Sequence, residues 1–220
     1  MRRRKAEASA RERARTAPDP KPRLVRVQPG ALPQAARAVG ALLEAVVPAH
    51  VRADPQLHGT PERVAEAWLL DLLDGYREDP ARILAETIPA PGPDLVAVTG
   101  IDFHSMCPHH LLPSRGLAHV AYVPRKKVVG FGQIARLVDC YAHRLVLEED
   151  LAREVASALV THLGARGAAC VLDAEQACLS MRGERRRAAR AHAQCFLGSL
   201  REANLQKRFL DLAREGKSRP

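Results

Sequence analysis

A cysteine and two histidines stand close together near the middle of the chain, at Cys107, His109 and His110. Another cysteine, Cys178, follows much later. Thiolate and imidazole groups are preferred zinc ligands, and a zinc with three protein ligands keeps one coordination position open for catalysis. Cys107, His110 and Cys178 therefore predict a catalytic zinc site, provided that the two stretches meet in space.

Two other interpretations of these residues are open. The three ligands could belong to a closed structural zinc site, with Cys140 or Cys195 as the fourth ligand, or to no metal site at all. The chain has five cysteines without regular spacing, which argues against a disulfide scaffold. We expect Cys170 in the core and His143, His162 and His192 at the surface.

The length of the chain predicts one domain with appendages, or one domain plus a small helical subdomain. The chain has 220 residues, of which 46% are hydrophobic and only 4% aromatic, so its core must consist mainly of Leu, Val, Ile and Ala. No run approaches the roughly 18 apolar residues of a membrane span. The beginning of the chain lacks the apolar segment of a signal peptide. These features predict a cytoplasmic protein without a membrane partner.

The net charge of +9 is concentrated at the beginning of the chain, where residues 1–25 carry nine Lys or Arg and three acidic residues. Residues 1–30 are also rich in Ala and Pro, so we expect a disordered basic tail there. Such a tail can contact nucleic acid. However, no RNA-recognition, zinc-finger or helix-turn-helix pattern follows it, and we do not expect a nucleic-acid partner.

The hydrophobic periodicity changes along the chain. A helical region is expected over 31–90, with helices at 32–47, 60–74 and 80–84, and it ends at a linker containing Pro89, Pro91 and Pro93. In the main domain, 91–220, the period of the apolar residues changes. We expect strands at 94–106, 116–123, 168–181 and 191–197, helices at 133–145 and 149–163 between the second and third strands, and a closing helix at 201–215. The predicted fold class is α+β.

Several motifs in this order resemble the GTP cyclohydrolase I family, which has the tunnelling fold. They are Thr-Pro-Glu-Arg-Val-Ala at 60–65, Ser-Met-Cys-Pro-His-His-Leu-Leu-Pro at 105–113, Gly-Leu-Ala-His-Val-Ala-Tyr-Val-Pro at 116–124, Ile-Ala-Arg-Leu-Val at 134–138 and Cys-Leu-Ser-Met-Arg-Gly at 178–183. The resemblance implies an antiparallel four-stranded sheet with two helices between its second and third strands. It also implies a homo-oligomer, usually a decameric ring, with active sites between subunits.

The resemblance further implies roles for single residues. Zn²⁺ would be held by Cys107, His110 and Cys178, and His109 would be a general acid and base at the purine ring. Glu149 would bind the guanine edge, and the triphosphate would be bound by Arg63, Arg136 and Arg182. The implied reaction is hydrolytic opening of the imidazole ring of GTP by zinc-activated water, giving 7,8-dihydroneopterin triphosphate and formate in folate and pterin biosynthesis.

The sequence departs from the family pattern at positions that belong to the expected site. Gln176 stands where the family usually has a catalytic histidine, and an amide cannot carry a proton at neutral pH. At substrate-binding positions, Gly132 and Gln133 replace Ser-Lys, and Glu148 replaces Gln. A divergent paralogue is therefore an alternative, one that acts on another purine nucleotide or stops at the ring-opened formamide. A second alternative is a non-catalytic ring scaffold that binds nucleotide or nucleic acid.

Overall fold

The computed structural model of the chain describes residues 29–183 and 185–216, so the basic tail predicted over 1–30 lies almost entirely outside the described residues. The elements before the main sheet are α2 (Ala31–Val46), α3 (Ala49–Arg52), η1 (Pro55–Leu57), α4 (Thr60–Glu66), η2 (Ala67–Leu72), η3 (Asp74–Arg77), α5 (Pro80–Ile83) and β1 (Ile88–Pro89). They are followed by β2 (Val96–Met106), β3 (Pro113–Val123), β4 (Lys127–Val128), α6 (Phe131–Ala142), α7 (Glu148–Thr161), β5 (Gly167–Gln176), α8 (Ala177–Ser180), β6 (Ala191–Gly198), η4 (Ser199–Arg201) and α9 (Ala203–Gly216).

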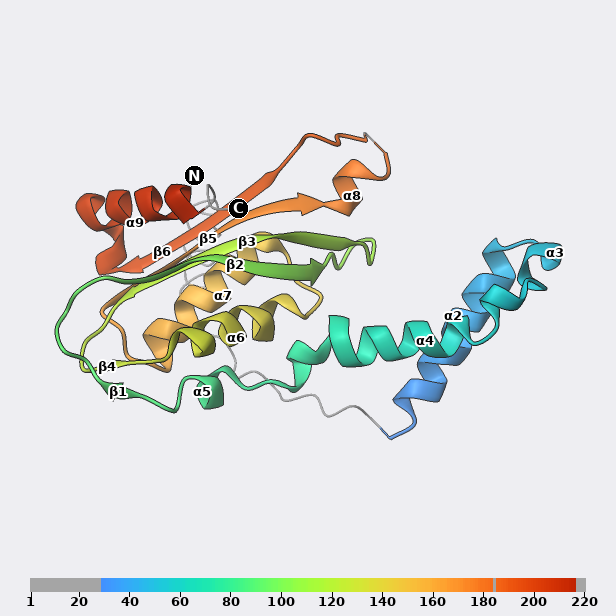
Figure 1. Cartoon of the computed structure of the whole chain (residues 1–220), viewed down its shortest axis with the longest axis horizontal. Helices are drawn as coiled ribbons and strands as arrows, with labels where there is room; N and C mark the ends of the chain where they lie inside the picture. The colour runs from blue at the N-terminus through green and yellow to red at the C-terminus, as the bar shows by residue number, and fades with distance from the viewer. Residues whose placement is uncertain (1–28, 184, 217–220) are drawn as a thin grey trace, which may run out of the picture.

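The main sheet is antiparallel and has the strand order β2-β3-β5-β6. Helices α6 and α7 lie between the second and third strands of this sheet in sequence and cover one of its faces, while α9 lies on the other face (Figure 1). The predicted α+β class is therefore confirmed, as is the position of the two helices. Among the described residues, no helix is both long and apolar enough to cross a membrane.

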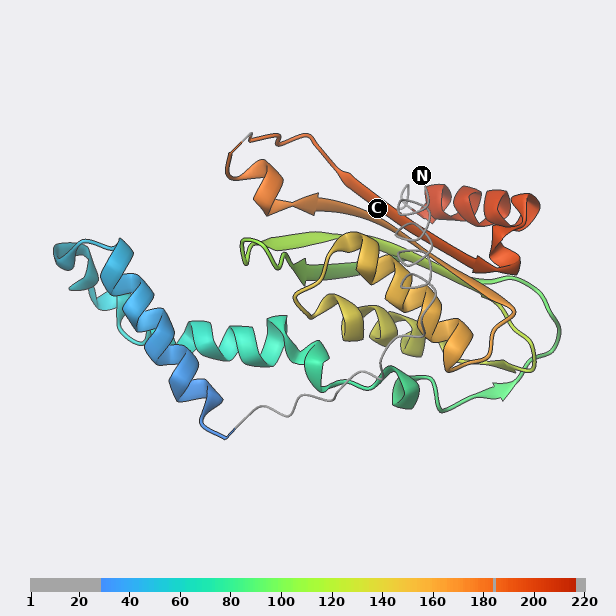
Figure 2. The same ribbon diagram turned by 180° about the vertical axis from the view of Figure 1, so that it is seen from behind.

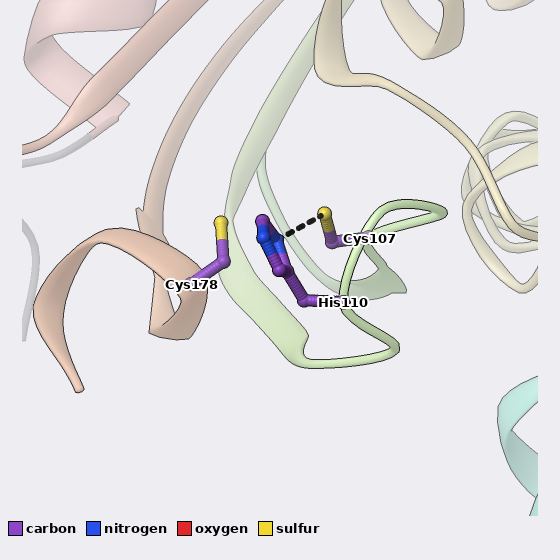
Figure 3. A group of neighbouring side chains, drawn as sticks. All are labelled: Cys107, His110 and Cys178. Atoms are coloured by element: carbon purple, nitrogen blue, oxygen red, sulfur yellow. Dashed lines mark hydrogen bonds between the residues drawn. The ribbon is translucent and has the colours of Figure 1, made fainter. Parts of the chain in front are cut away.

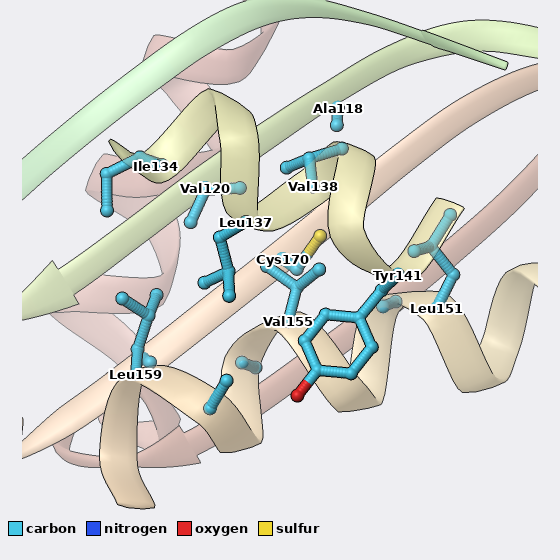
Figure 4. Packing of buried hydrophobic residues seen from close by; sticks show 14 of the residues in the cluster. Ala118, Val120, Ile134, Leu137, Val138, Tyr141, Leu151, Val155, Leu159 and Cys170 are labelled. Carbon is cyan, nitrogen blue, oxygen red and sulfur yellow. The ribbon is translucent and has the colours of Figure 1, made fainter. Parts of the chain in front are cut away.

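The larger core lies between the sheet and helices α6 and α7 (Figure 4). Leu137 on α6 and Leu151, Val155 and Leu159 on α7 are completely buried. Their spacing of three or four residues places them on one face of each helix. Burial of such side chains contributes about 1.5–3 kcal/mol each, so this face fixes the position of α7 against the sheet.

The helices α2, α3 and α4 form an arm that extends away from the sheet, as both views show (Figures 1 and 2). Just after the arm, η3 is bound to the end of α6 by a hydrogen bond of 2.7 Å between Asp74 Oδ1 and His143 Nδ1. His143 also stacks on His104 at 4.1 Å between ring centroids. The prediction of His143 as a surface residue was wrong, because its side chain is only 15% exposed. The domain boundaries stay a prediction.

Three predicted segments differ from the structure. The strand expected over 168–181 ends at Gln176, and Cys178 lies on the short helix α8. The last residue paired with β3 is Gln176, opposite Ser114, and Pro113, the only residue of β3 before Ser114, has no N–H to continue the ladder. The expected linker and turn around Pro89 and Lys127 pair as β1 and β4. The helix expected over 60–74 changes to a π-helical turn at Ala67.

Candidate metal centre

The loop between β2 and β3 and the helix after β5 bring the three predicted metal ligands together (Figure 3). Cys107 follows the last residue of β2, His110 lies in the loop that leads into β3, and Cys178 lies on α8 immediately after β5. The ligand atoms of these three residues all lie within 4.8 Å of one another. The prediction that the two stretches meet in space is therefore confirmed.

The loop between β2 and β3 is closed by its own backbone. Leu111 N–H donates to Cys107 O at 2.9 Å, and Cys107 N–H donates to Leu112 O at 3.0 Å. This tight turn requires a left-handed backbone at Leu111, with φ of 53°. Such a conformation costs a non-glycine residue about 1–3 kcal/mol, which the rest of the loop must supply. The turn brings His109 and His110 beside Cys107.

The donor atoms of this group suit a zinc ion, and they lie somewhat farther apart than around a bound zinc. Cys107 Sγ and His110 Nδ1 are 3.9 Å apart. A tetrahedral zinc with ligand distances of about 2.0–2.3 Å would separate its ligands by about 3.3–3.8 Å. Two thiols and an imidazole also form a donor set that binds zinc in preference to magnesium or calcium. Cys140 and Cys195 do not join the group, which among the described residues consists of Cys107, His110 and Cys178 alone.

The two thiols of this group lie close enough for one to affect the pKa of the other. Desolvation raises the pKa of the Cys178 thiol, and the neighbouring Cys107 raises it further, whereas Arg182 lowers it. Two thiolates side by side therefore need a cation to stabilise them. Arg182 Nη1 lies 2.9 Å from His110 Nε2. This contact places the guanidinium group of Arg182 against the imidazole ring of His110.

Three further predicted site residues lie around the metal group. His109 Nδ1 is 3.9 Å from Cys107 Sγ, and Gln176 Oε1 is 3.9 Å from Cys178 Sγ. Glu148 begins α7, and Ser105 Oγ donates a hydrogen bond of 3.2 Å to its Oε1. Burial raises the pKa of Glu148, and hydrogen bonds from Ser105, Ser114 and Gln176 offset this only in part. Glu149 follows Glu148 on the same helix turn.

The other predicted substrate residues are engaged elsewhere in the chain. Arg63 donates hydrogen bonds to His58 O at 2.9 Å and to Thr60 Oγ1 at 2.8 Å. Arg136 Nη2 donates to both carboxylate oxygens of Glu78, at 2.9 and 2.8 Å. Gln133 ties α6 to the segment before it, because its Nε2 donates to Ile83 O at 2.7 Å. Their substrate-binding roles stay predictions.

Sequence reasoning missed Ser105 and Ser114 as part of this site. Each is almost completely buried, and the two are paired across β2 and β3. Ser105 lies two residues before Cys107, which in a strand places both side chains on the same face. That alternation was visible in the sequence. The pairing with Ser114 was not, because it depends on the register between strands.

Comparison with known proteins identifies relatives over most of the chain. The model of the family described as GTP cyclohydrolase I matches residues 35–214. A protein of Ralstonia nicotianae named GTP cyclohydrolase 1 is 49% identical over 149 residues, which are 68% of this chain and 71% of that protein. A protein of Chromobacterium violaceum with the same name is 43% identical over 189 residues, 85% of this chain and 90% of that protein.

Proposed function

The chain belongs to the GTP cyclohydrolase I family, and from this we propose that it opens the imidazole ring of GTP by zinc-dependent hydrolysis and releases formate and 7,8-dihydroneopterin triphosphate. The chain is a hydrolase of GTP cyclohydrolase I type. The observation that carries the finer proposal is the convergence of Cys107, His110 and Cys178 within 4.8 Å. The predicted cytoplasmic location stays a prediction.

Cys107, His110 and Cys178 would hold the zinc. A bound zinc lowers the pKa of water to about 7 and so supplies a hydroxide nucleophile at neutral pH. With three protein ligands, the site keeps a position open for it. Cys107 is 9% exposed, so it lies on the inner side of the metal group, whereas His110 is exposed at the surface of the loop. A substrate would therefore approach over His110.

His109 supports the proton transfers that the reaction requires. Ring opening needs a proton on the departing ring nitrogen, and imidazole exchanges protons near neutral pH. His109 lies beside Cys107, so its ring is near any purine bound at the metal group. Gln176 lies on the opposite side, beside Cys178. Since its amide cannot exchange a proton, Gln176 would act by donating or accepting hydrogen bonds.

Arg182 is the predicted phosphate ligand that lies at the metal group, in contact with His110. Its guanidinium group stays charged and can bind two phosphate oxygens at once. Glu149 would accept hydrogen bonds from the guanine edge. Hydrogen bonds join Arg63, Arg136 and Gln133 to nearby parts of the same chain. In the proposed ring, these residues would reach substrate bound to another subunit.

A homo-oligomeric ring would bring such residues together. Strands β2 and β6 form the two outer edges of the main sheet. Edge strands present unpaired backbone groups that can pair with another copy. A ring of sheets, decameric as predicted, would use both edges and place one subunit's arm near the next subunit's metal group.

The test is incubation of zinc-loaded protein with GTP, followed by mass identification of the products. We expect loss of GTP, one formate per turnover and dihydroneopterin triphosphate. Accumulation of the formamide would mean that the reaction stops after ring opening, as in the paralogue alternative. An unchanged GTP pool, together with salt-dependent binding of nucleic acid, would favour the scaffold alternative. A Cys107→Ser protein with full activity would refute the zinc mechanism.

A further inference from the structure

The loop that connects α6 to α7, residues 143–147, contacts both η3 and the strand that leads to the metal group. Leu145 forms a parallel bridge with Met106, and Val146 N–H donates to Met106 O at 3.3 Å. Met106 is the last residue of β2, and Cys107 follows it directly. A movement of this loop would therefore move the backbone beside Cys107.

The same loop leads into the first turn of α7, where Glu148 and Glu149 lie. Ser105 Oγ on β2 donates to Glu148 Oε1 at 3.2 Å, which ties this turn to the strand before the metal group. The placement of the loop thus also determines where Glu149, the residue proposed to bind the guanine edge, stands relative to that group.

Arg144 holds this loop against η3. Its Nε donates to Gly75 O at 3.2 Å, and its Nη2 donates to Glu78 O at 3.4 Å. Nη2 also donates to Cys140 Sγ at 3.3 Å, in the last turn of α6. A guanidinium group carries five N–H donors in a fixed plane, so this one side chain can join η3, the residue after it and α6.

Two tyrosine rings support the guanidinium group. Arg144 Cζ lies 4.9 Å from the ring centroid of Tyr141 on α6 and 5.9 Å from that of Tyr76 on η3. A cation within about 6 Å of a ring centroid is attracted to the ring. In addition, Tyr76 OH accepts a hydrogen bond of 3.1 Å from Leu145 N–H. The segment η3 therefore holds two successive residues of the loop, Arg144 through its side chain and Leu145 through its backbone.

The backbones of η3 and α6 lie in close contact where the loop begins. A Cβ atom added at Gly75 would lie 2.6 Å from Cys140 O and 2.8 Å from His143 O. Asp74 Oδ1, from the residue before Gly75, lies 2.7 Å from His143 Nδ1. This close fit fixes the start of the loop relative to η3, and Arg144 follows as its second residue.

We infer that Arg144 is a positioning residue of the candidate site: through its contacts with η3 it sets the placement of the loop 143–147, and through this loop the placement of the metal ligand Cys107 and of Glu149. The inference rests on the proposed function for the roles of Cys107 and Glu149. Arg144 acts on both through the loop, because its own hydrogen bonds are made with η3, the residue after it and α6.

The first test measures the zinc affinity of the full-length protein by competition with a chromophoric chelator. Loss of a group that orients a metal ligand costs about 10–100-fold in metal affinity, and we expect a loss in this range in Arg144→Ala. Tyr76→Phe removes one hydrogen bond and keeps the ring, so it should lose about 2–10-fold. The matched control is Arg77→Ala, also on η3, whose side chain donates to Leu70 O on η2; it should keep the parent affinity. Parent affinity in Arg144→Ala would overturn the inference.

The second test replaces zinc with Co²⁺ and records the absorption bands of the bound metal. These bands report the geometry around the metal, which a variant that only lowers the free energy of unfolding leaves unchanged. We expect a changed spectrum in Arg144→Ala. Arg144→Lys keeps the charge but loses the planar fork, so its spectrum should lie between those of Arg144→Ala and the parent. A parent spectrum in Arg144→Ala would contradict the positioning role.

The effect on Glu149 is measured by GTP turnover at saturating zinc. A displacement of about 1 Å can cost about 100-fold in rate, so Arg144→Ala should lower kcat/KM for GTP by up to that factor even with its metal site filled, whereas Arg77→Ala should not. An unchanged kcat/KM in Arg144→Ala would overturn the part of the inference that concerns Glu149.

The zinc and cobalt tests are independent of GTP turnover. If both give the expected results but the parent protein leaves GTP unchanged, the proposed function fails, while the positioning of the metal ligand stands. If the parent converts GTP and Arg144→Ala binds zinc as the parent does, the inference fails alone. Should Arg144→Ala not fold by circular dichroism, Tyr76→Phe decides, since parent zinc affinity in that variant would then overturn the inference.

Discussion

The close contact between β3 and β5 at Gly116 makes this glycine the most sensitive position near the metal centre. Gly116 is paired with Phe103 on β2 and with Ala174 on β5. A Cβ atom added at Gly116 would lie 2.2 Å from Asp173 O and 2.7 Å from Ala174 Cα. Both neighbours are backbone atoms of β5, so no side chain can turn away to make room.

The expected size of the Gly116→Ala effect follows from these distances. The contact with Asp173 O is about 1 Å short of the 3.4 Å at which ordinary contact begins, so β5 must move by a similar amount relative to β3. Overpacking of this kind costs about 1–3 kcal/mol. The same shift separates His110, which precedes β3, from Cys178, which follows β5. Zinc sites tolerate deviations of about 0.2 Å, so zinc affinity should fall as well.

Urea unfolding and chelator competition measure the two effects. We expect a lower unfolding midpoint and weaker zinc binding in Gly116→Ala. The matched control is Gly132→Ala on α6, where an added Cβ meets nothing within 4 Å. There the helix should gain up to about 1 kcal/mol from the better propensity of Ala. If Gly116→Ala keeps the parent midpoint and zinc affinity, the argument from strand spacing is refuted.

Three shorter predictions follow from other parts of the structure. Cys178→Ser should lose most of its zinc by elemental analysis yet keep the parent far-ultraviolet circular dichroism, because Cys178 lies outside the core. Leu159→Ala, at a fully buried position, should lower the free energy of unfolding in urea by about 2–5 kcal/mol. Desolvation and His143 lower the pKa of His104 from its ordinary value of 6.5. The folded state therefore favours neutral His104. Its contribution to the free energy of unfolding is present above pH 6.5 and should fade as the pH falls below that value. Urea unfolding at pH 7.5 and 5.5 should show a smaller loss of stability in His104→Gln than in the parent protein.

The parts of the fold that the sequence predicted correctly are those with a strong local pattern. The apolar faces of α6 and α7 repeat every three or four residues, and the alternation of β2 marks its path to Cys107. The end of β5 was missed because a strand needs a partner, and the partner of Gln176 is set by the register with β3. His143 was misplaced for a related reason, since its partners Asp74 and His104 are distant in sequence.

The candidate site, like the fold, could be predicted from the sequence only where the pattern is local. Cys107, His109 and His110 share one loop, so spacing alone predicts that they meet. Cys178 joins them through the antiparallel order of β3 and β5, which the resemblance implied and the structure confirms. The contact between Glu148 and Ser105 could not be derived from spacing. It depends on how the beginning of α7 meets β2 and β3, on which Ser105 and Ser114 lie.

The ion pair between Arg136 and Glu78 bears on how substrate could be held. The two side chains are 61% and 34% exposed, and a pair this exposed contributes only about 0–1 kcal/mol. Phosphate forms charge-assisted, bidentate hydrogen bonds with arginine that are stronger than those between neutral groups. A triphosphate could therefore displace Glu78 at little cost. Arg182, by contrast, lies against His110, so under the proposed function it would be the arginine that meets phosphate beside the metal group, whereas Arg136 would have to leave Glu78 first.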